Sequence, residues 1–429
     1  MDGLVYPDRT VHTGLLEYKN VYRPARVISY DKESGELVLH NYMDFDDLKD
    51  YVKISYELTQ DGLVISKGKL PEVSAAPHSE GKINLKINVP ESGKCYLKFI
   101  YHLKKELPLL DEDHILGFDE IEVSQKDAKC QLAEKWVEKT VTDSELQVSE
   151  DDTQIHIKGR EFAYTIDRRT ALFTEMKFAG REYLNHPMEL NIWRAPTDND
   201  MYIKSEWKKA HYDKAYTRAY TTEVVQGKHG VKITSHASVV AETVQKILDV
   251  TITWKIEAAG KIDADIAVTK DDEFPDLPRF GVRMFLDKKL SAARYFGMGP
   301  QESYCDKHQA ASHGLYHANV DDLHEDYIRP QENGSHYDCE YVELNNSRYG
   351  IVVSAENAFS FNASYYTQEE LEKKTHNYEL TESDSVVFCV DYALNGIGSN
   401  SCGPVVLDQY RFDDVLFRFQ FTLIPYVKG

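Results

Sequence analysis

Hydrophobic and polar residues alternate along much of the chain with a period of two. Side chains on a strand point in turn to its two faces, so this alternation predicts strands with one buried face and one solvent-facing face. The clearest runs are Ile83, Leu85, Ile87 and Val89; Phe162, Tyr164 and Ile166; Val250, Ile252, Trp254 and Ile256; Ile262, Ala264, Ile266 and Val268; and Phe417, Phe419, Phe421 and Leu423.

Turn residues separate these runs, as at Ser34-Gly35, Asp61-Gly62, Ser92-Gly93 and Gly260. Short strands with regular turns predict sandwiches rather than a βαβ fold. Helical signal is scarce. Thr367 to Glu370 reads as a capping box before a short helix, and 203–212 could form another.

The strand-like runs fall into two groups, which predicts two domains. Residues 20–124 hold about seven runs, which suits an immunoglobulin-like sandwich. A charged stretch near 125–145 then precedes a larger set of strands that begins at about residue 154. A chain of 429 residues is too long for one ordinary core, and its 28 tyrosines favour strands.

The formal net charge is −21, and no basic cluster offsets it, so nucleic-acid binding is not expected. No run approaches 18 consecutive apolar residues, and the start of the chain lacks a signal peptide, so we expect no membrane span and a cytoplasmic location. The six cysteines are scattered without a CxxC pair, which favours reduced thiols over a disulfide frame or zinc site.

Candidate chemistry is concentrated in two polar loops. Residues 194–200 (RAPTDND) can be interpreted as a polar binding loop or hard-cation site, or as a turn in which Arg194 is paired internally; the second interpretation is favoured. Residues 396–404 form a loop of small residues that allows close approach of a ligand. Cys402 has no neighbouring histidine and is a weak nucleophile candidate. No HxH or HExxH spacing signals a catalytic metal.

Several segments resemble bacterial β-galactosidases of glycoside hydrolase family 2, in the same order over essentially the whole chain. They are 1–10 with His12 and 17–19, the RAPxDND-like loop 194–200, the GxGPQExY-like corner 297–304, the PxENG-like turn 330–334 and the GIG-containing loop 396–403.

The resemblance implies an all-β architecture: an immunoglobulin-like sandwich, then a large antiparallel supersandwich resembling galactose mutarotase. The expected boundaries are 1–20 for the exit segment of a catalytic barrel, 21–125 for the first sandwich, 126–145 for a linker and 146–429 for the second. The resemblance also implies that the barrel with both catalytic glutamates precedes this chain. We therefore expect a non-catalytic portion that completes the active-site rim and the oligomer scaffold. The upstream domains would be the partners of this chain, and the intact enzyme would bind a galactoside. The intact enzyme would also bind sodium and magnesium, mostly through the missing domains, and no cofactor is expected in this chain.

The resemblance also implies roles for particular residues. Asp2 matches a position where some members have an asparagine that ligates sodium, so it is the candidate metal ligand. Cys402 stands where some members place a tryptophan that stacks on the sugar, and a thiol supplies far less contact area. The candidate substrate-binding residues are Asp198, Asn199, Asp200, Asn400 and Cys402, and no catalytic residue is expected.

Two other functions remain open from the sequence. An epimerase of the galactose mutarotase type would need a histidine acid and a carboxylate base, and no matching pair is found by motif. A free-standing carbohydrate-binding module is the other alternative.

Overall fold

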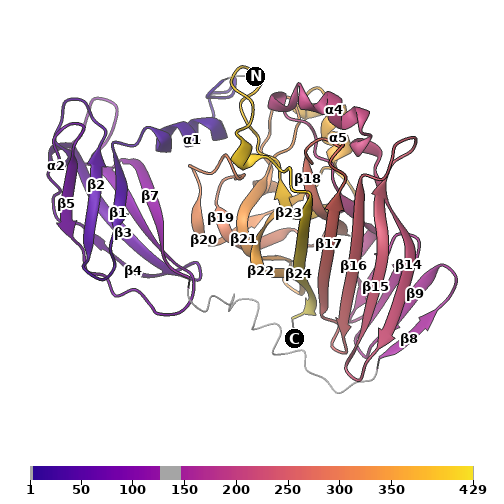
Figure 1. Cartoon of the computed structure of the whole chain (residues 1–429). Coiled ribbons are helices and arrows are strands. Elements are labelled where there is room, and N and C mark those ends of the chain that lie inside the picture. Colours follow the sequence, from indigo (N-terminus) through magenta and orange to yellow (C-terminus); the bar gives the residue numbers. More distant parts are fainter. Residues whose placement is uncertain (1–2, 126–145, 429) are drawn as a thin grey trace. The chain divides into compact units, whose positions relative to one another are not determined.

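The computed structural model of the protein describes residues 3–125 and 146–428. Asp2 and the expected linker 126–145 lie outside the described residues. Within that part the chain forms two compact units: one contains 3–125 together with His308–Leu315, and the other contains 146–307 and 316–428. Strands dominate both units, which confirms the all-β class (Figure 1). No helix among the described residues is long and apolar enough to cross a membrane.

The smaller unit has seven strands over residues 20–124, the number predicted from its hydrophobic runs. They form two sheets, with orders β1-β2-β5 and β4-β3-β6-β7. The elements are α1 (Thr13–Val21), β1 (Ala25–Tyr30), β2 (Glu36–Asn41), α2 (Leu48–Tyr51), β3 (Val52–Gln60), β4 (Leu63–Lys69), β5 (Glu80–Asn84), β6 (Cys95–Leu103) and β7 (Ile115–Ser124).

The predicted strand over 83–89 is only partly formed. Its hydrophobic residues are half-buried in alternation as expected, but β5 ends at Asn84. The reason is the partner strand: Asn84 pairs with Glu36, the first residue of β2, and beyond it the chain turns at Gly35, where φ is +78°. No ladder partner therefore remains for residues 85–89 on this strand.

A distant piece of sequence completes the smaller unit. In His308–Leu315, the backbone N–H groups of Gln309 and Ala310 each donate to the Glu17 carboxylate at 2.8 Å. The His313 ring stacks on Tyr96 with centroids 4.0 Å apart, and its Nδ1 lies 2.9 Å from Glu120. Nothing in the hydrophobic pattern singled out this segment, because these contacts join residues separated by about two hundred positions or more.

Asp119 on β7 is a hydrogen-bonding centre inside the smaller unit. Its carboxylate accepts from Arg23 at 2.6 Å, from the Tyr101 hydroxyl at 2.5 Å and from the Val27 amide at 2.9 Å. A hydrogen bond to a charged group contributes about 1.5–3 kcal/mol.

We expect Tyr101→Phe to destabilise the smaller unit by about 2 kcal/mol, because the fully buried ring stays packed while one bond to the Asp119 carboxylate is lost. Hydrogen exchange of the β6 amides would measure this. Tyr42→Phe is the control, since that ring is 48% exposed, and it should change stability by less than about 0.5 kcal/mol. Equal exchange in both variants would contradict the role given to Asp119.

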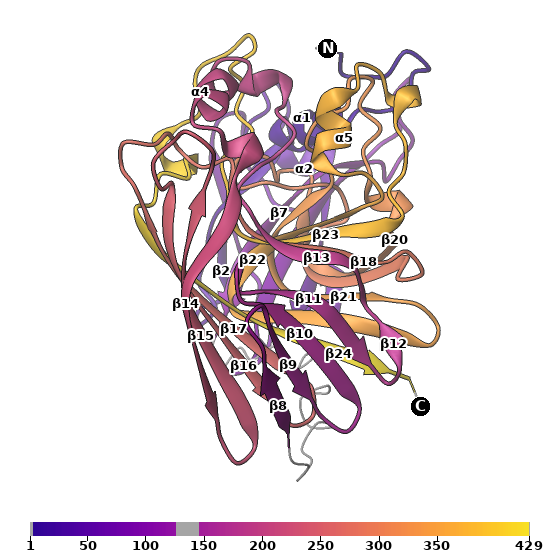
Figure 2. The same cartoon turned by 90° about the vertical axis from the view of Figure 1, so that its right-hand side faces the viewer.

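The larger unit is built on a twelve-stranded sheet and a five-stranded sheet. The main path of the large sheet is β13-β18-β23-β22-β24-β17-β16-β15-β14, with β19, β20 and β21 joined to it through β22, and the small sheet has the order β12-β11-β10-β9-β8. The small sheet lies in front of the large one in Figure 2. Phe173 of β11 packs edge-on against the buried Trp254 of β16, 4.9 Å between centroids. This aromatic contact joins the two layers.

The strands of the larger unit are β8 (Gln147–Glu150), β9 (Gln154–Lys158), β10 (Phe162–Asp167), β11 (Leu172–Phe178), β12 (Arg181–Glu182), β13 (Leu184–Asn191), β14 (Tyr216–Gln226), β15 (Gly230–Val240), β16 (Leu248–Glu257), β17 (Ile262–Lys270), β18 (Arg279–Asp287), β19 (Ala292–Gly299), β20 (Ser312–Asn319), β21 (Ser335–Asn345), β22 (Tyr349–Ser364), β23 (Ser385–Leu394) and β24 (Leu416–Val427). Residues 312–315 at the start of β20 belong to the smaller unit, and its remaining residues belong to the larger one. Its helices are η2 (Asp198–Asp200), α4 (Ile203–Lys209), η3 (Tyr212–Lys214), η4 (Asp321–Leu323), α5 (Gln368–Lys373), η5 (Asn377–Glu379) and η6 (Asp408–Tyr410).

The strongest sequence patterns of this unit are confirmed. β16 and β17 pair over the predicted alternating runs, and the turn between them has Gly260 at φ +90°. Both predicted short helices form, as α4 and α5, and they lie at the same end of the unit (Figure 1). The Thr367 side chain accepts a hydrogen bond from the Glu370 amide at 3.1 Å, which is the N-cap that the capping box predicted.

Candidate functional site

The recognisable polar segments of the larger unit interlock through hydrogen bonds. The Asp198 amide donates to the Gln331 side chain at 3.0 Å, and the Glu332 amide donates to Ala195 O at 3.0 Å. The Gly334 amide donates to the Glu302 carboxylate at 2.8 Å. Segments 194–200, 297–304 and 330–334, which are far apart in sequence, therefore form one connected group, and they meet 396–403 as well.

Arg194 connects the first of these segments to the last. Its guanidinium is fully buried and makes a bidentate pair with Asp200, with N–O distances of 2.7 and 3.1 Å. It also donates to the carbonyl oxygens of Asn395 at 2.5 Å and Gly396 at 3.2 Å. Burial lowers the pKa of Arg194, but the attraction of Asp200 outweighs it, so the pKa lies above its ordinary value. The interpretation of 194–200 as a turn in which Arg194 is paired internally therefore fits the pair that Arg194 makes with Asp200.

Two further side chains hold the loop 396–403 in place. Asn199 donates to Gly398 O at 2.7 Å and accepts from the Ser401 hydroxyl at 2.7 Å. Asp306 accepts from the backbone N–H groups of Ile397 at 2.9 Å and Gly398 at 2.7 Å. Sequence reasoning missed Asp306, and its only signal was its place just after the GMGPQESY corner.

The candidate substrate-binding residues differ in accessibility. Cys402 is exposed and carries a free thiol, and Asp198, Asn199 and Asn400 are half-buried. Asp200 is 3% exposed, and both of its carboxylate oxygens are bonded to Arg194. The structure thus brings Asn199 to the loop that carries Asn400 and Cys402, while Asp200 acts on that loop through Arg194. Their role in sugar binding stays a prediction.

A second buried ionic group lies below these loops. Arg279, at the start of β18, makes a bidentate pair with Asp391 of β23, at 3.0 and 2.5 Å, and reaches Glu332 at 3.1 Å. All three are at most 4% exposed. Burial raises the pKa of both carboxyls, and Arg279 opposes that rise. The sequence patterns did not indicate this group.

Glu302 is the centre of a third buried group. This residue is 6% exposed, and its carboxylate accepts from Lys307 at 2.5 Å, from the Tyr327 hydroxyl and from the Gly334 amide. Burial raises the pKa of Glu302, but Lys307 and these hydrogen bonds outweigh it, so the pKa lies below its ordinary value. The conspicuous carboxylates of the motifs are therefore engaged in positioning loops within this part of the chain.

His336 of β21 is the buried titratable group beside the 297–304 corner. Its Nδ1 bonds Met298 O at 3.3 Å, and its Nε2 is buried with no hydrogen-bond partner among the described residues. Burial lowers the pKa of His336 to about 4, below its ordinary 6.5. The folded protein therefore keeps this ring neutral where the unfolded chain would bind a proton.

We expect stability to fall as pH drops from about 6.5 to 4, because the unfolded state takes up the His336 proton first. This residue alone would account for a loss of up to about 3 kcal/mol. Urea unfolding across this range should show a shallower pH dependence for His336→Phe, whose ring can still stack on Phe361. Parallel curves for the two proteins would contradict the assignment.

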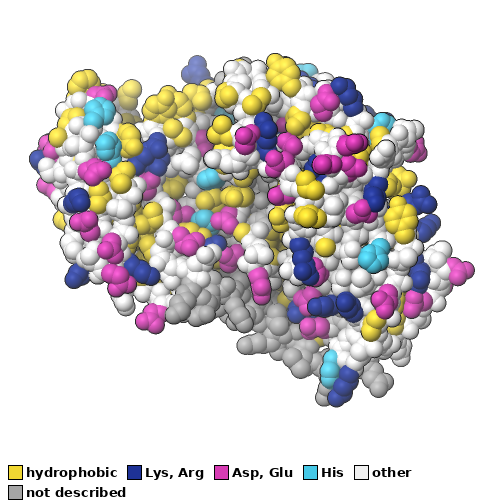
Figure 3. All heavy atoms as spheres, in the orientation of Figure 1, with side chains coloured by type: hydrophobic (Ala, Val, Ile, Leu, Met, Phe, Trp, Pro, Cys, Tyr) yellow, Lys and Arg dark blue, Asp and Glu magenta, His cyan; other side chains and the backbone are white. Residues whose placement is uncertain are grey.

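Metal binding has no support from side-chain clusters in the part of the chain that the structure describes, where no three His, Cys, Asp or Glu residues could hold an ion together. Asp2, the candidate sodium ligand, lies outside that part, so the sodium and magnesium expectation stays a prediction. On the face drawn in Figure 3, basic side chains are interspersed with acidic ones and form no continuous basic area.

Comparison with known families finds two matches along the chain. The family described as beta galactosidase small chain matches residues 158–423, and the one described as beta-galactosidase, domain 4, matches residues 37–124. The first covers more than half of the chain.

Curated relatives match nearly the whole chain but only part of their own length. A beta-galactosidase from Actinobacillus pleuropneumoniae is 44% identical over 426 residues, covering 99% of this chain and 41% of that protein. One from Staphylococcus xylosus is 31% identical over 428 residues, covering 99% and 42%. Among solved structures, a galactose 1-epimerase from Lactobacillus acidophilus is similar, with a TM-score of 0.36 and 8% identity, covering 67% of this chain and all of that one.

Proposed function

The chain belongs to the beta galactosidase small chain family, and from that premise we propose that it is the C-terminal, non-catalytic portion of a β-galactosidase. The carrying observation is the pattern of coverage, in which 99% of this chain matches about 41% of the relatives. The remaining part would carry the retaining hydrolysis of terminal β-D-galactosides such as lactose, by two glutamates. The partners of this chain are then the upstream catalytic domains and, in the intact enzyme, the galactoside.

In this proposal the loop 396–403 contributes to the rim of the active site. Its support is the way Arg194, Asn199 and Asp306 fix the loop while Cys402 stays exposed. Asp198, Asn199, Asn400 and Cys402 would border the sugar, and Asp200 would position them. Asp2, with co-ligands from the upstream domains, would hold sodium, and magnesium would be bound by those domains.

The proposal also covers location and assembly. The enzyme would act in the cytoplasm as a homo-oligomer to which the two sandwiches contribute scaffold. The cysteines support a reducing compartment, since the five within the described residues are all free thiols.

Reconstitution tests the proposal. The pure chain is mixed with a protein covering the upstream part of the Actinobacillus relative, and hydrolysis of a nitrophenyl β-galactoside is measured. We expect turnover from the mixture and none from this chain alone. Turnover by this chain alone would refute the non-catalytic assignment. A folded pair that co-purifies but stays inactive would refute the contribution to the site.

A further inference from the structure

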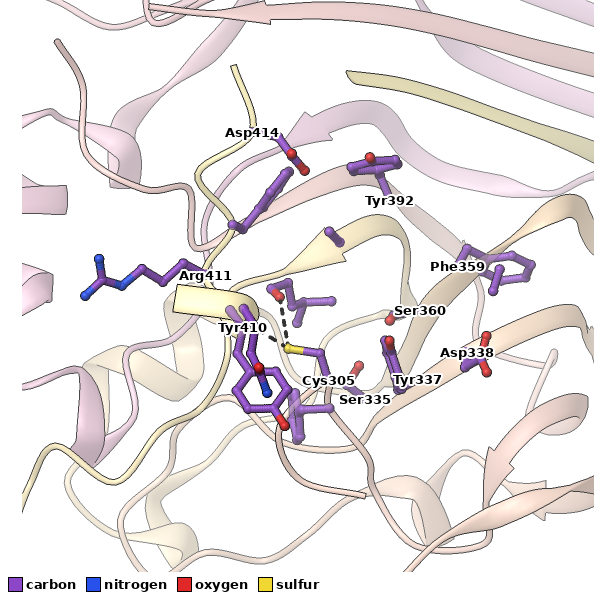
Figure 4. Close-up of a pocket in the computed structure, with 16 residues that line it drawn as sticks. Cys305, Ser335, Tyr337, Asp338, Phe359, Ser360, Tyr392, Tyr410, Arg411 and Asp414 are labelled. Atoms are coloured by element: carbon purple, nitrogen blue, oxygen red, sulfur yellow. Dashed lines mark hydrogen bonds between the residues drawn. The ribbon is translucent and has the colours of Figure 1, made fainter. Parts of the chain in front are cut away.

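A pocket of about 320 Å³ opens in the larger unit beside β21, β22, β23 and the segment before β24. None of the residues 396–403 lines it, so it is separate from the rim loop. Figure 4 shows Tyr337, Tyr392, Tyr410 and Asp414 around its space, with Cys305 and Ser335 at one side. We propose that this pocket binds a neutral aldose ring, at a site that does not depend on the galactosidase assignment.

The aromatic side chains of the pocket suit the apolar face of a sugar ring. Tyr392 is half-buried, and its ring stacks on Phe417 with centroids 4.9 Å apart and an angle of 16° between planes. It also contacts Phe412 at 5.8 Å. These contacts fix the orientation of Tyr392, so a ligand that stacks on it does not have to order a mobile ring.

Several polar groups in the pocket have no protein partner. The Ser335 hydroxyl is buried without a hydrogen bond, in a residue that is 0% exposed. Among the described residues, no hydrogen bond or ion pair engages the hydroxyls of Tyr392 and Tyr410 or the carboxylate of Asp414. Of these groups only Ser335 is buried, whereas Tyr392 and Tyr410 are half-buried and Asp414 is exposed. Buried polar groups are normally satisfied, so the unpartnered Ser335 hydroxyl indicates a missing water or ligand. Together these groups offer both donors and acceptors, which is what the hydroxyls of a sugar require.

The charges of the pocket exclude other classes of ligand. Asp338 and Asp414 disfavour an anion, and the one cation, Arg411, points away from the pocket in Figure 4 and pairs with Asp408 at 3.2 Å. Burial raises the pKa of the Cys305 thiol to about 12, so it stays neutral and is a poor metal ligand. The volume lies at the lower end for ligand sites, which fits one ring rather than a long oligosaccharide.

Saturation-transfer NMR and calorimetry on the whole chain would test this site with methyl β-D-galactopyranoside and methyl β-D-glucopyranoside. For a ligand of this size we expect a dissociation constant on the order of 1 mM. Sorbitol, an acyclic polyol, and choline, a cation, should bind at least about tenfold more weakly. Preference for choline, or no sugar signal at about 20 mM, would overturn the proposal.

Matched variants locate the binding. Asp414→Asn and Tyr410→Phe are conservative changes at the surface of the pocket and should each weaken sugar binding about tenfold or more. Arg411→Ala, at the residue that follows Tyr410 but is directed away from the pocket, should leave sugar binding unchanged, as should Cys402→Ser in the rim loop. Loss of sugar binding in Cys402→Ser, or unchanged binding in Asp414→Asn and Tyr410→Phe, would overturn the assignment of the sugar to this pocket. Neither result would bear on the β-galactosidase proposal, which the reconstitution experiment tests.

Discussion

Replacing Arg279 by methionine should destabilise the larger unit by about 3–5 kcal/mol. The change leaves Asp391 and Glu332, which are 0% and 4% exposed, without the guanidinium that bonds both. A buried carboxylate without a partner is far more costly than the ion pair it came from. Urea unfolding followed by the buried Trp207 and Trp254 would measure the loss.

The loss should depend on pH in a defined direction. Burial raises the pKa of both carboxyls, and without Arg279 nothing nearby of opposite charge limits the rise as strongly. When the pKa of a carboxyl is higher in the folded protein than in the unfolded chain, the folded state binds the proton more tightly. The free energy of unfolding therefore increases as pH falls. The variant should therefore be closer to wild type at pH 5 than at pH 8.

Arg418→Met is the matched control for this change. Arg418 also makes a bidentate pair, with Asp265, but its side chain is 60% exposed. Exposed ion pairs contribute about 0–1 kcal/mol, so this variant should unfold near the wild-type midpoint. Equal losses in the two variants would mean that burial is not what makes the Arg279 group important.

Arg279 also marks where prediction from sequence stops. Strands such as β16 and β17 could be predicted because the alternation of hydrophobic and polar residues is visible within a few neighbouring positions. Arg279 and Asp391 are separated by 112 positions, and nothing near either one indicates the other. For the same reason the sequence did not indicate that His308–Leu315 belongs to the smaller unit, since its contacts there are with residues far away in the chain.

The run 83–89 shows a second limit. Its alternation correctly predicted which side chains are half-buried, but not that β5 ends at Asn84. A strand needs a hydrogen-bonding partner, and the partner here ends at a turn. In the candidate site, likewise, the polar loops were evident from sequence. The hydrogen bond between Asn199 and Ser401 could not be predicted, because the two residues are 202 positions apart and only the fold brings them together.

Asp306 provides the last and sharpest test of the candidate site. Its carboxylate accepts hydrogen bonds from two backbone N–H groups of the rim loop, those of Ile397 and Gly398. Hydrogen bonds to a charged group contribute about 1.5–3 kcal/mol each, so Asp306→Ala should lower the opening free energy of the loop by about 3 kcal/mol or more. Because every 1.4 kcal/mol is a factor of ten, exchange of these two amides should accelerate about 100-fold.

Two further variants separate loop positioning from loss of charge. Asp306→Asn keeps one acceptor oxygen and should give an intermediate acceleration, whereas Asp408→Ala removes a carboxylate on an aspartate whose side chain is 94% exposed and should give none. In the reconstituted enzyme, Asp306→Ala should lower kcat/KM for the galactoside with normal urea stability, since a rim loop that opens no longer presents Cys402 and Asn400 in one geometry. Accelerated exchange with unchanged kinetics would show that the loop is held by Asp306 but does not serve the active site.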